Sequence, residues 1–210
     1  MAEYTFYFNP MSRAQIARWA LHEAGADYEP VLVTWEHKPQ ALLDANAMAK
    51  LPTIIHHHGG HDHVVSEAAA VCHYLAEMSA PALLPQAHEK ADYFRWLFFA
   101  AGPVEAAITA HSLGWTAPDR EAMVGFGSYA RTMDALDGWL SGHAYVCGER
   151  FTMADVYVGS AVNWGLQFGS MPARDSFKAY WERLSARPAY LEASGIDNAM
   201  IAEMQAAKDG

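Results

Sequence analysis

The hydrophobic pattern of this 210-residue chain changes character near Met78. Up to that residue, short runs of high β propensity alternate with helical periodicities in the order β-α-β-α-β-β-α. From Glu89 onward only helical periodicities remain. Two strands joined by a helix favour a parallel βαβ unit. The sequence therefore predicts an α/β domain over 1–80, a linker over 81–88 and an all-helical domain over 89–210.

The first domain is expected to contain four strands and three helices. Strands are predicted near Thr5–Phe8, Glu29–Trp35, Leu51–Ile55 and His63–Val65. Helices are predicted from Ser12 to Gly25, around Pro39–Ala45 and from Ser66 to Met78. Ser12 and Gln15 form a capping-box pattern, and Ser66 is expected to cap the third helix. Gly59 and Gly60 predict a hairpin turn between the last two strands.

The second domain is expected to consist of helices alone. They are predicted from Glu89 with a kink or break at Gly102–Pro103, over Asp119–Ser141, from Thr152, over Asp175–Ala186 and, more weakly, from Asp197. Thr152 and Asp155 repeat the capping-box pattern. Pro188 is expected to stop the helix before it.

Charge and composition exclude several classes of partner. With 24 acidic and 14 basic residues the net charge is -10, which disfavours nucleic acid and anionic membranes. Cys72 and Cys147 stand in different contexts without a CxxC motif, which fits a reducing compartment. The first residues lack a signal-peptide pattern, and the apolar stretch Trp96–Val104 is shorter than the roughly 20 residues of a membrane span. We therefore expect a cytoplasmic protein with neither nucleic-acid nor membrane partners.

Five motif-bearing segments follow one another along nearly the whole chain. They are Asn9–Gly25, Asn46–Thr53, Ser66–Leu75, Phe151–Val156 and Arg187–Tyr190. Each is a weak signal alone, but in this order and spacing they resemble the cytosolic glutathione S-transferase family of bacterial type. The resemblance implies a two-domain α+β protein, with a thioredoxin-like βαβαββα domain that binds glutathione and an all-α domain after it. It also implies glutathione transferase activity in detoxification and a two-fold homodimer.

Glutathione conjugation needs a thiolate, whereas a free thiol has a pKa of about 8.5. A hydroxyl donor and a helix N-terminus aimed at the sulfur both favour the anion. By resemblance Ser12 is that donor, although it can equally be only the helix cap, whose oxygen accepts and whose proton stays free. Arg13 is the rival, because its permanent charge also stabilises a thiolate. Since no cysteine stands here, mixed-disulfide chemistry is disfavoured.

The resemblance also assigns residues that bind the other parts of glutathione, which is a tripeptide. Pro52 is implied to be cis, which turns the backbone of Leu51 toward the cysteinyl part of glutathione. Glu67 is implied to bind the ammonium group, although an acidic residue at a helix start also suits the helix dipole. Lys50 and His37 are candidates for the glycyl carboxylate, with solvated side chains as the alternative.

Three alanines depart from the family pattern. Ala47 and Ala49 replace the usual proline and glycine of the loop before Pro52. Ala68 replaces the usual serine or threonine, so one side-chain contact to the glutamyl carboxylate is absent. A backbone N–H at the helix start can still hold that carboxylate, so Ala68 stays among the binding residues.

An apolar co-substrate is expected between the first loop and the first long helix of the second domain. The candidate lining residues are Met11, Trp96, Phe99, His111 and Trp115. Helix–helix core is the alternative for several of them.

Five histidines surround the predicted hairpin turn: His56, His57, His58, His61 and His63. Imidazoles can bind zinc or nickel. Alternation along a strand is expected to place them on both faces, so that they do not converge. We therefore predict no functional metal, and glutathione as the only co-substrate besides the electrophile.

Two alternatives to conjugation remain open. The same scaffold can support glutathione-dependent isomerisation, peroxide reduction or dehalogenation, since a fold does not fix the reaction. It can also serve as a non-catalytic ligand carrier or partner-binding protein. The combination of Ser12, Pro52 and Glu67 favours an enzyme.

Overall fold

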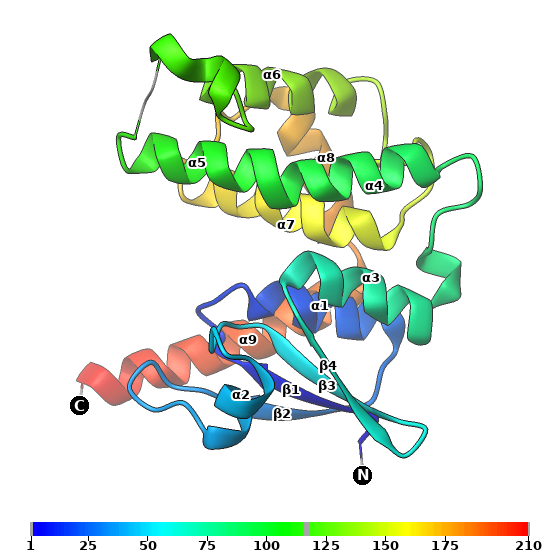
Figure 1. The fold of residues 1–210 in the computed structure, drawn as a ribbon, viewed down its shortest axis with the longest axis vertical. Coiled ribbons are helices and arrows are strands. Elements are labelled where there is room, and N and C mark those ends of the chain that lie inside the picture. Colours follow the sequence, from blue (N-terminus) through cyan, green and yellow to red (C-terminus); the bar gives the residue numbers. More distant parts are fainter. Residues whose placement is uncertain (1, 116–117, 210) are drawn as a thin grey trace. The chain divides into compact units, whose positions relative to one another are not determined.

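The computed structural model describes residues 2–115 and 118–209, which form two compact units (Figure 1). One consists of the described residues of Met1–Leu84 and Ala186–Gly210, the other of those of Pro85–Ser185. We call them the sheet unit and the helical unit and describe each by itself. Their make-up confirms the predicted α+β class. In the described ranges, no helix has both the length and the apolar character needed to cross a bilayer.

The sheet unit is built on a four-stranded mixed sheet. Its strands are β1 (Tyr4–Phe8), β2 (Tyr28–Leu32), β3 (Thr53–His58) and β4 (His61–Ser66), in the spatial order β2-β1-β3-β4. The helices between or after them are α1 (Ala14–Ala24), α2 (Gln40–Ala45) and α3 (Ala68–Met78). β1 pairs parallel with β2 and antiparallel with β3, and β4 closes an antiparallel hairpin with β3 (Figure 1). The predicted βαβαββα order is confirmed.

The last helix of the chain, α9 (Pro188–Asp209), belongs to the sheet unit. This corrects the domain limits predicted from sequence, which gave all of 89–210 to the helical domain. It also corrects the start of the last helix, which begins at Pro188 and not near Asp197. The preceding helix, Asp175–Ser185, does end before Pro188, as predicted. Proline suits the first helical position, where its fixed φ is already helical and no N–H is needed.

Two ion pairs hold the last part of the chain against α1, one from Asp197 of α9 and one from Arg187 just before it. Arg18 Nε donates to Asp197 Oδ1 at 2.9 Å, and both side chains are almost fully buried, at 2% and 3% exposure. Arg187 donates to both carboxylate oxygens of Glu23, at 2.6 and 2.7 Å. Burial raises the pKa of Asp197, and the neighbouring Arg18 charge opposes that shift. These contacts explain why the end of the chain joins the sheet unit.

The helical unit contains five α-helices within its described residues. They are α4 (Lys90–Phe99), α5 (Glu105–Ser112), α6 (Tyr129–Leu140), α7 (Met153–Gln167) and α8 (Asp175–Ser185). A π-helical turn, η2 (Ala100–Val104), joins α4 to α5 and contains Pro103. This confirms the predicted interruption at Gly102–Pro103, since proline cannot donate the next helical hydrogen bond. A short 3-10 helix, η1 (Pro81–Leu83), lies in the predicted linker.

The helix predicted over Asp119–Ser141 is wrong in its first half. A 3-10 segment, η3 (Pro118–Met123), comes first, and α6 begins only at Tyr129. Ser128 is the cap, and its Oγ accepts from the backbone N–H of Arg131. Gly127 lies between the two segments with a φ of +67°, a conformation that ends helical geometry and favours glycine.

A buried carboxylate organises the start of α7. Asp155 is fully buried, and its Oδ2 accepts from Thr152 N at 2.8 Å and from Thr152 Oγ1 at 3.0 Å. Its Oδ1 accepts from Val146 N and from the Tyr180 hydroxyl, both at 2.8 Å. Burial raises the pKa of Asp155 to about 6, and these donors act in the opposite direction. The predicted capping box of Thr152 and Asp155 is confirmed, and it also joins α7 to α8.

Candidate functional site

The strand register brings three loop segments to one edge of the sheet. Tyr7 of β1 is paired with Thr53 of β3, and Thr53 is paired with Ser66 of β4. The residues just beyond these pairs are therefore neighbours: the loop after β1, the Leu51–Pro52 pair before β3, and Glu67 after β4 (Figure 1). Residues from separate parts of the sequence can thus act on one ligand at this edge.

The loop after β1 is held by Asn9, whose place in the sequence predicts only the end of a strand. Asn9 is fully buried, and its Nδ2 donates to Val33 O at 2.9 Å while its Oδ1 accepts from Met11 N at 2.9 Å. Its backbone oxygen accepts from both Ser12 N, at 3.1 Å, and Ser12 Oγ, at 2.7 Å. An asparagine after a strand is too common a pattern to have revealed this role.

Ser12 lies one residue earlier than a helix cap would. Helix α1 starts at Ala14 with Arg13 at its N-cap position, and Gln15 donates to Pro10 O instead of completing a capping box. Ser12 Oγ does accept from Ala14 N, at 3.1 Å. However, its proton is donated to Asn9 O, which corrects the expectation that the cap leaves the proton free. The Arg13 side chain is exposed.

The second segment carries the implied cis peptide. The Leu51–Pro52 bond is cis, and Pro52 is buried while Leu51 is partly exposed. Asn46 Nδ2 donates to Thr53 Oγ1 at 2.9 Å, and Thr53 Oγ1 donates to Lys50 O at 2.9 Å, which fixes the loop before β3. The two candidates for the glycyl carboxylate, Lys50 and His37, have exposed side chains.

Ala49 adopts the backbone conformation that a glycine favours at this position of the loop. Its φ is +49°, although alanine rarely adopts the left-handed region. Lys38 Nζ donates to Ala49 O at 2.9 Å, so a half-buried ammonium group borders the same loop. Lys38 was not among the predicted site residues, because no sequence pattern distinguishes this lysine from a solvated one.

The third segment contains a strained residue. Glu67 has φ +67° and ψ +114°, a conformation that side chains with a Cβ rarely adopt, and its carboxylate is exposed at the start of α3. The expected cap, Ser66, is instead the last residue of β4. Ala68 follows as the first residue of α3 and is 8% exposed. Backbone strain of this kind is concentrated at functional sites.

Comparison with known protein families agrees with this geometry. Residues 2–77 match the model of the glutathione S-transferase N-terminal domain, and residues 85–188 match that of the C-terminal domain. The chain belongs to the glutathione S-transferase family.

Named members of the glutathione S-transferase family resemble the chain over most of its length. It is 29% identical to Glutathione S-transferase 3 of Zea mays in an alignment of 212 positions that covers 90% of this chain and 92% of that protein. A theta class glutathione S-transferase of Xanthomonas axonopodis pv. citri, solved with glutathione bound, is 26% identical with a TM-score of 0.70, covering 92% and 98% of the two chains. The glutathione transferase URE2P5 of Phanerochaete chrysosporium shares the fold, with a TM-score of 0.77 and 20% identity. The match covers 98% of this chain and 99% of that chain.

The predicted co-substrate residues of this family member fall in both units. Met11 is 40% exposed in the sheet unit, and Trp115 is 68% exposed in the helical unit. The ring of His111 stacks on Tyr129 with centroids 4.1 Å apart. Trp96 is different, because its side chain is buried and belongs to the core of the helical unit.

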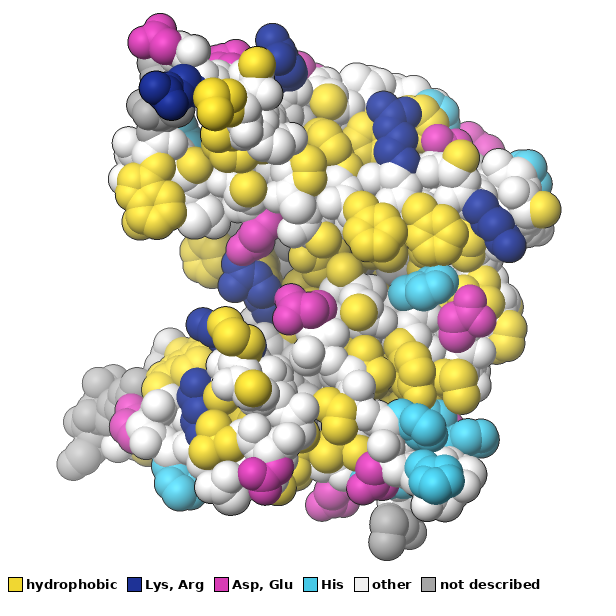
Figure 2. Space-filling model, in the orientation of Figure 1, with side chains coloured by type: hydrophobic (Ala, Val, Ile, Leu, Met, Phe, Trp, Pro, Cys, Tyr) yellow, Lys and Arg dark blue, Asp and Glu magenta, His cyan; other side chains and the backbone are white. Residues whose placement is uncertain are grey.

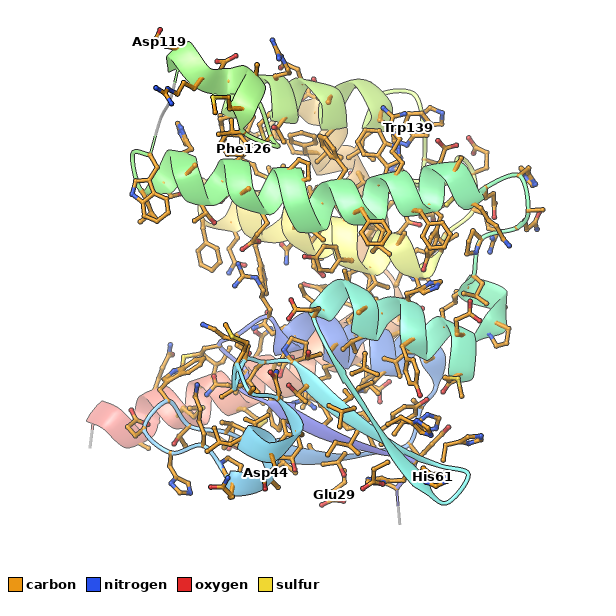
Figure 3. The ribbon with its side chains drawn as sticks, in the orientation of Figure 1. Glu29, Asp44, His61, Asp119, Phe126 and Trp139 are labelled. Carbon is orange, nitrogen blue, oxygen red and sulfur yellow. The ribbon has the colours of Figure 1, made fainter. Side chains whose placement is uncertain are left out.

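An aromatic cluster surrounds Trp96. Its ring centroid lies 5.2 Å from that of Phe99 and 5.3 Å from that of Trp139, which projects from α6 (Figure 3). The guanidinium of Arg95 lies 4.7 Å from the Trp96 centroid. Trp96 therefore packs in the core of the helical unit, which is the alternative to a pocket role that the sequence left open. That the other four line a co-substrate pocket stays a prediction.

In the histidine-rich hairpin of this transferase the imidazoles lie on both faces, as predicted, but four of the five share one face. Cross-strand partners share a face, and the register pairs His56 with His63 and His58 with His61. His56, His58, His61 and His63 therefore lie on one face. Figure 2 shows histidine side chains gathered near the hairpin turn, where Figure 3 labels His61. His57 points to the other face and contacts Asp62, with Nδ1 and Oδ1 2.7 Å apart.

His56 is the buried member of this cluster. Its ring stacks on Tyr4 at a centroid distance of 4.4 Å, and its Nδ1 lies 3.0 Å from the Tyr74 hydroxyl. Burial lowers the pKa of His56, so the neutral form is favoured. Within residues 2–115 and 118–209, no group of three or more histidine, cysteine or acidic side chains has an arrangement suited to a metal ion.

Proposed function

We propose that this chain is a glutathione transferase that activates the thiol of glutathione at the sheet edge formed by the β1–α1 loop, cis-Pro52 and Glu67. The observation that carries the proposal is that three sequence-distant segments with these features meet at one edge of the sheet. Membership of the family and the glutathione bound in the Xanthomonas relative support the same conclusion.

In the proposed complex the tripeptide lies along this edge. The backbone of Leu51 pairs with the cysteinyl residue, and the exposed Glu67 carboxylate binds the ammonium group. The start of α3 at Ala68 offers backbone N–H groups to the glutamyl carboxylate. Lys50 and His37 are candidates for the glycyl carboxylate, and Lys38 joins them because its ammonium group borders the same loop.

The proposed chemistry is nucleophilic attack by a thiolate. The thiol proton passes to solvent, and the Ser12 hydroxyl turns from Asn9 O to the sulfur, a charged and therefore stronger acceptor. The sulfur then attacks an electrophilic carbon, forming a carbon–sulfur bond as the leaving group departs with its electron pair. Arg13 remains the alternative source of stabilisation, through charge.

The co-substrate, assembly and location complete the proposal. We expect the co-substrate to be an apolar electrophile. A two-fold homodimer in the cytoplasm, acting in detoxification, is expected from the family resemblance. Retention on immobilised glutathione together with turnover of a chlorinated nitrobenzene supports the enzyme. Retention without any turnover supports a ligand carrier instead.

Ser12→Ala is expected to raise the pKa of the bound thiol by one to two units and to lower kcat/KM near neutral pH by about 10–100-fold. A hydrogen bond to a charged acceptor contributes about 1.5–3 kcal/mol, and this variant removes one. The thiol pKa is read from the pH dependence of thiolate absorbance in the binary complex. Ser12→Thr, which keeps the hydroxyl, is the matched control. If Arg13→Ala abolishes turnover while Ser12→Ala retains it, Arg13 and not Ser12 stabilises the thiolate.

Glu67→Gly is expected to stabilise the protein while weakening glutathione binding. Glycine adopts a φ near +67° without strain, so the free energy of unfolding rises by about 1 kcal/mol. The lost carboxylate lowers affinity for glutathione by about tenfold, as expected for a charge-assisted contact. Urea unfolding and calorimetric titration measure the two effects. Glu67→Gln retains the strained backbone, so it is expected to weaken binding without the gain in stability.

A further inference from the structure

We propose that Asn9 is a positioning residue for thiol activation, which acts by fixing the position of the Ser12 hydroxyl oxygen. The inference rests on the proposed function, because it assumes that Ser12 donates to the glutathione sulfur. Asn9 itself is fully buried and is not expected to touch the tripeptide. Its effect on the reaction is transmitted through the loop that it holds.

The carboxamide of Asn9 ties this loop to the sheet through two backbone contacts. Nδ2 donates to Val33 O at 2.9 Å, and Oδ1 accepts from Met11 N at 2.9 Å. Val33 follows β2 directly, and its own N–H donates to Phe8 O at 2.8 Å. One side chain thus bridges the ends of the two parallel strands and the first turn of the loop. Only a side chain with a donor and an acceptor at this reach can make both contacts.

The backbone oxygen of Asn9 then sets the direction of the Ser12 hydroxyl. It accepts from Ser12 N at 3.1 Å and from Ser12 Oγ at 2.7 Å, so both of its lone pairs are occupied by one residue. Ser12 Oγ also accepts from Ala14 N at 3.1 Å, so the position of the oxygen is fixed by contacts on both sides. The only freedom left to the hydroxyl is rotation of its proton.

This arrangement determines how easily the thiolate can be stabilised. The hydroxyl has one proton, which it can donate either to the neutral carbonyl of Asn9 or to the anionic sulfur. The sulfur forms the stronger hydrogen bond because it is charged. Because the oxygen is already in place, the change needs no new side-chain rotamer when glutathione ionises. Without the Asn9 carboxamide the loop is no longer tied to Val33, and the hydroxyl loses its fixed position.

The test measures the pKa of the bound glutathione thiol in four proteins: wild type, Asn9→Ala, Ser12→Ala and the double variant. In Asn9→Ala the thiol pKa is expected to rise by about one unit and kcat near neutral pH to fall about tenfold, with KM for glutathione changed by less than about threefold. In the Ser12→Ala background the same substitution is expected to leave the thiol pKa unchanged, because Asn9 acts through the hydroxyl. Asn198→Ala, at an exposed asparagine of α9, is the control and should change nothing.

The outcomes separate this inference from the proposed function. An equal rise in thiol pKa with and without Ser12, or no rise at all in Asn9→Ala, overturns the role of Asn9. Absence of glutathione binding by the wild-type protein overturns the proposed function itself. If Asn9→Ala does not fold, Asn9→Ser provides the same measurement, because its neutral hydroxyl can still accept from Met11 N but is too short to donate to Val33 O. A rise in thiol pKa that vanishes in the Ser12→Ala background again supports the inference.

Discussion

Replacing Asp155 by alanine is expected to lower the free energy of unfolding by about 3–5 kcal/mol. The substitution leaves four buried donors without their acceptor: Thr152 N, Thr152 Oγ1, Val146 N and the Tyr180 hydroxyl. Each unsatisfied buried polar group costs about 1–3 kcal/mol, and partial relaxation reduces the sum. Urea unfolding followed by tryptophan fluorescence measures the change.

Asp175→Ala is the matched control for this prediction. Asp175 also lies in the first turn of a helix, α8, but its side chain is fully exposed, and its ion pair with Lys178 is 3.4 Å long. We expect this variant to differ from wild type by less than about 0.5 kcal/mol, as exposed substitutions usually do. If both variants lose the same stability, burial and the four donors are not the cause.

The raised pKa of Asp155 adds a pH dependence with a defined sign. Its pKa is about 6 in the folded protein, above the roughly 3.9 of an unperturbed aspartate. Between these values the folded state binds more protons than the unfolded state, so this residue's contribution to stability falls as pH rises from about 4 to about 6. Asp155→Asn removes the titrating group and is expected to remove that part of the slope.

Local signals in the sequence predicted those parts of the fold that local chemistry determines. The capping box of Thr152 and Asp155 is present because both partners are only three residues apart. The interruption at Gly102–Pro103 follows from the missing proline N–H. The hairpin turn at Gly59 and Gly60 follows from their positive φ angles, +63° and +79°.

Predictions failed where contacts between residues far apart in the sequence decide the structure. They also failed where one residue type can take either of two local roles. Serine can cap a helix or end a strand, and Ser66 ends β4 because it pairs with Thr53. Proline can stop a helix or start one: α8 ends at Ser185, before Pro188, as predicted, but Pro188 also starts α9, which was expected only from Asp197. The buried Arg18–Asp197 pair holds α9 to the sheet unit. Alternation along one strand also says nothing about the partner strand, so the shared face of His56 and His63 required the pairing register.

The sequence predicted the residue types of the candidate site, but it predicted little of their geometry. Resemblance supplied Ser12, Pro52 and Glu67, and the cis bond at Pro52 agrees with it. Periodicity could not reveal that the Ser12 proton is already engaged, because that depends on the path of the loop fixed by Asn9. The strained backbone of Glu67 is likewise visible only in the structure.

Asp197→Ala is expected to lower the free energy of unfolding by about 3–5 kcal/mol, because it leaves the buried guanidinium of Arg18 without its carboxylate. Arg18 keeps one contact, from Nη1 to the Tyr28 hydroxyl at 2.9 Å, and its charge stays above the Phe8 ring at 4.3 Å. Nη2 is buried and has no hydrogen-bond partner among the described residues, so the environment offers little compensation. Chemical unfolding at neutral pH measures the loss.

A double variant distinguishes the loss of the ion pair from a simple loss of packing. Replacing both Arg18 and Asp197 by apolar residues, as in Arg18→Met with Asp197→Leu, is expected to recover most of the stability, because no charge is then left buried. Glu192→Ala, which removes an exposed carboxylate from the same helix, is the control and should cost less than about 1 kcal/mol. If the double variant is no more stable than Asp197→Ala, the guanidinium left unpaired is not the source of the penalty. Packing of α9 against α1 then depends on the shape of these side chains and not on the compensation of a buried charge.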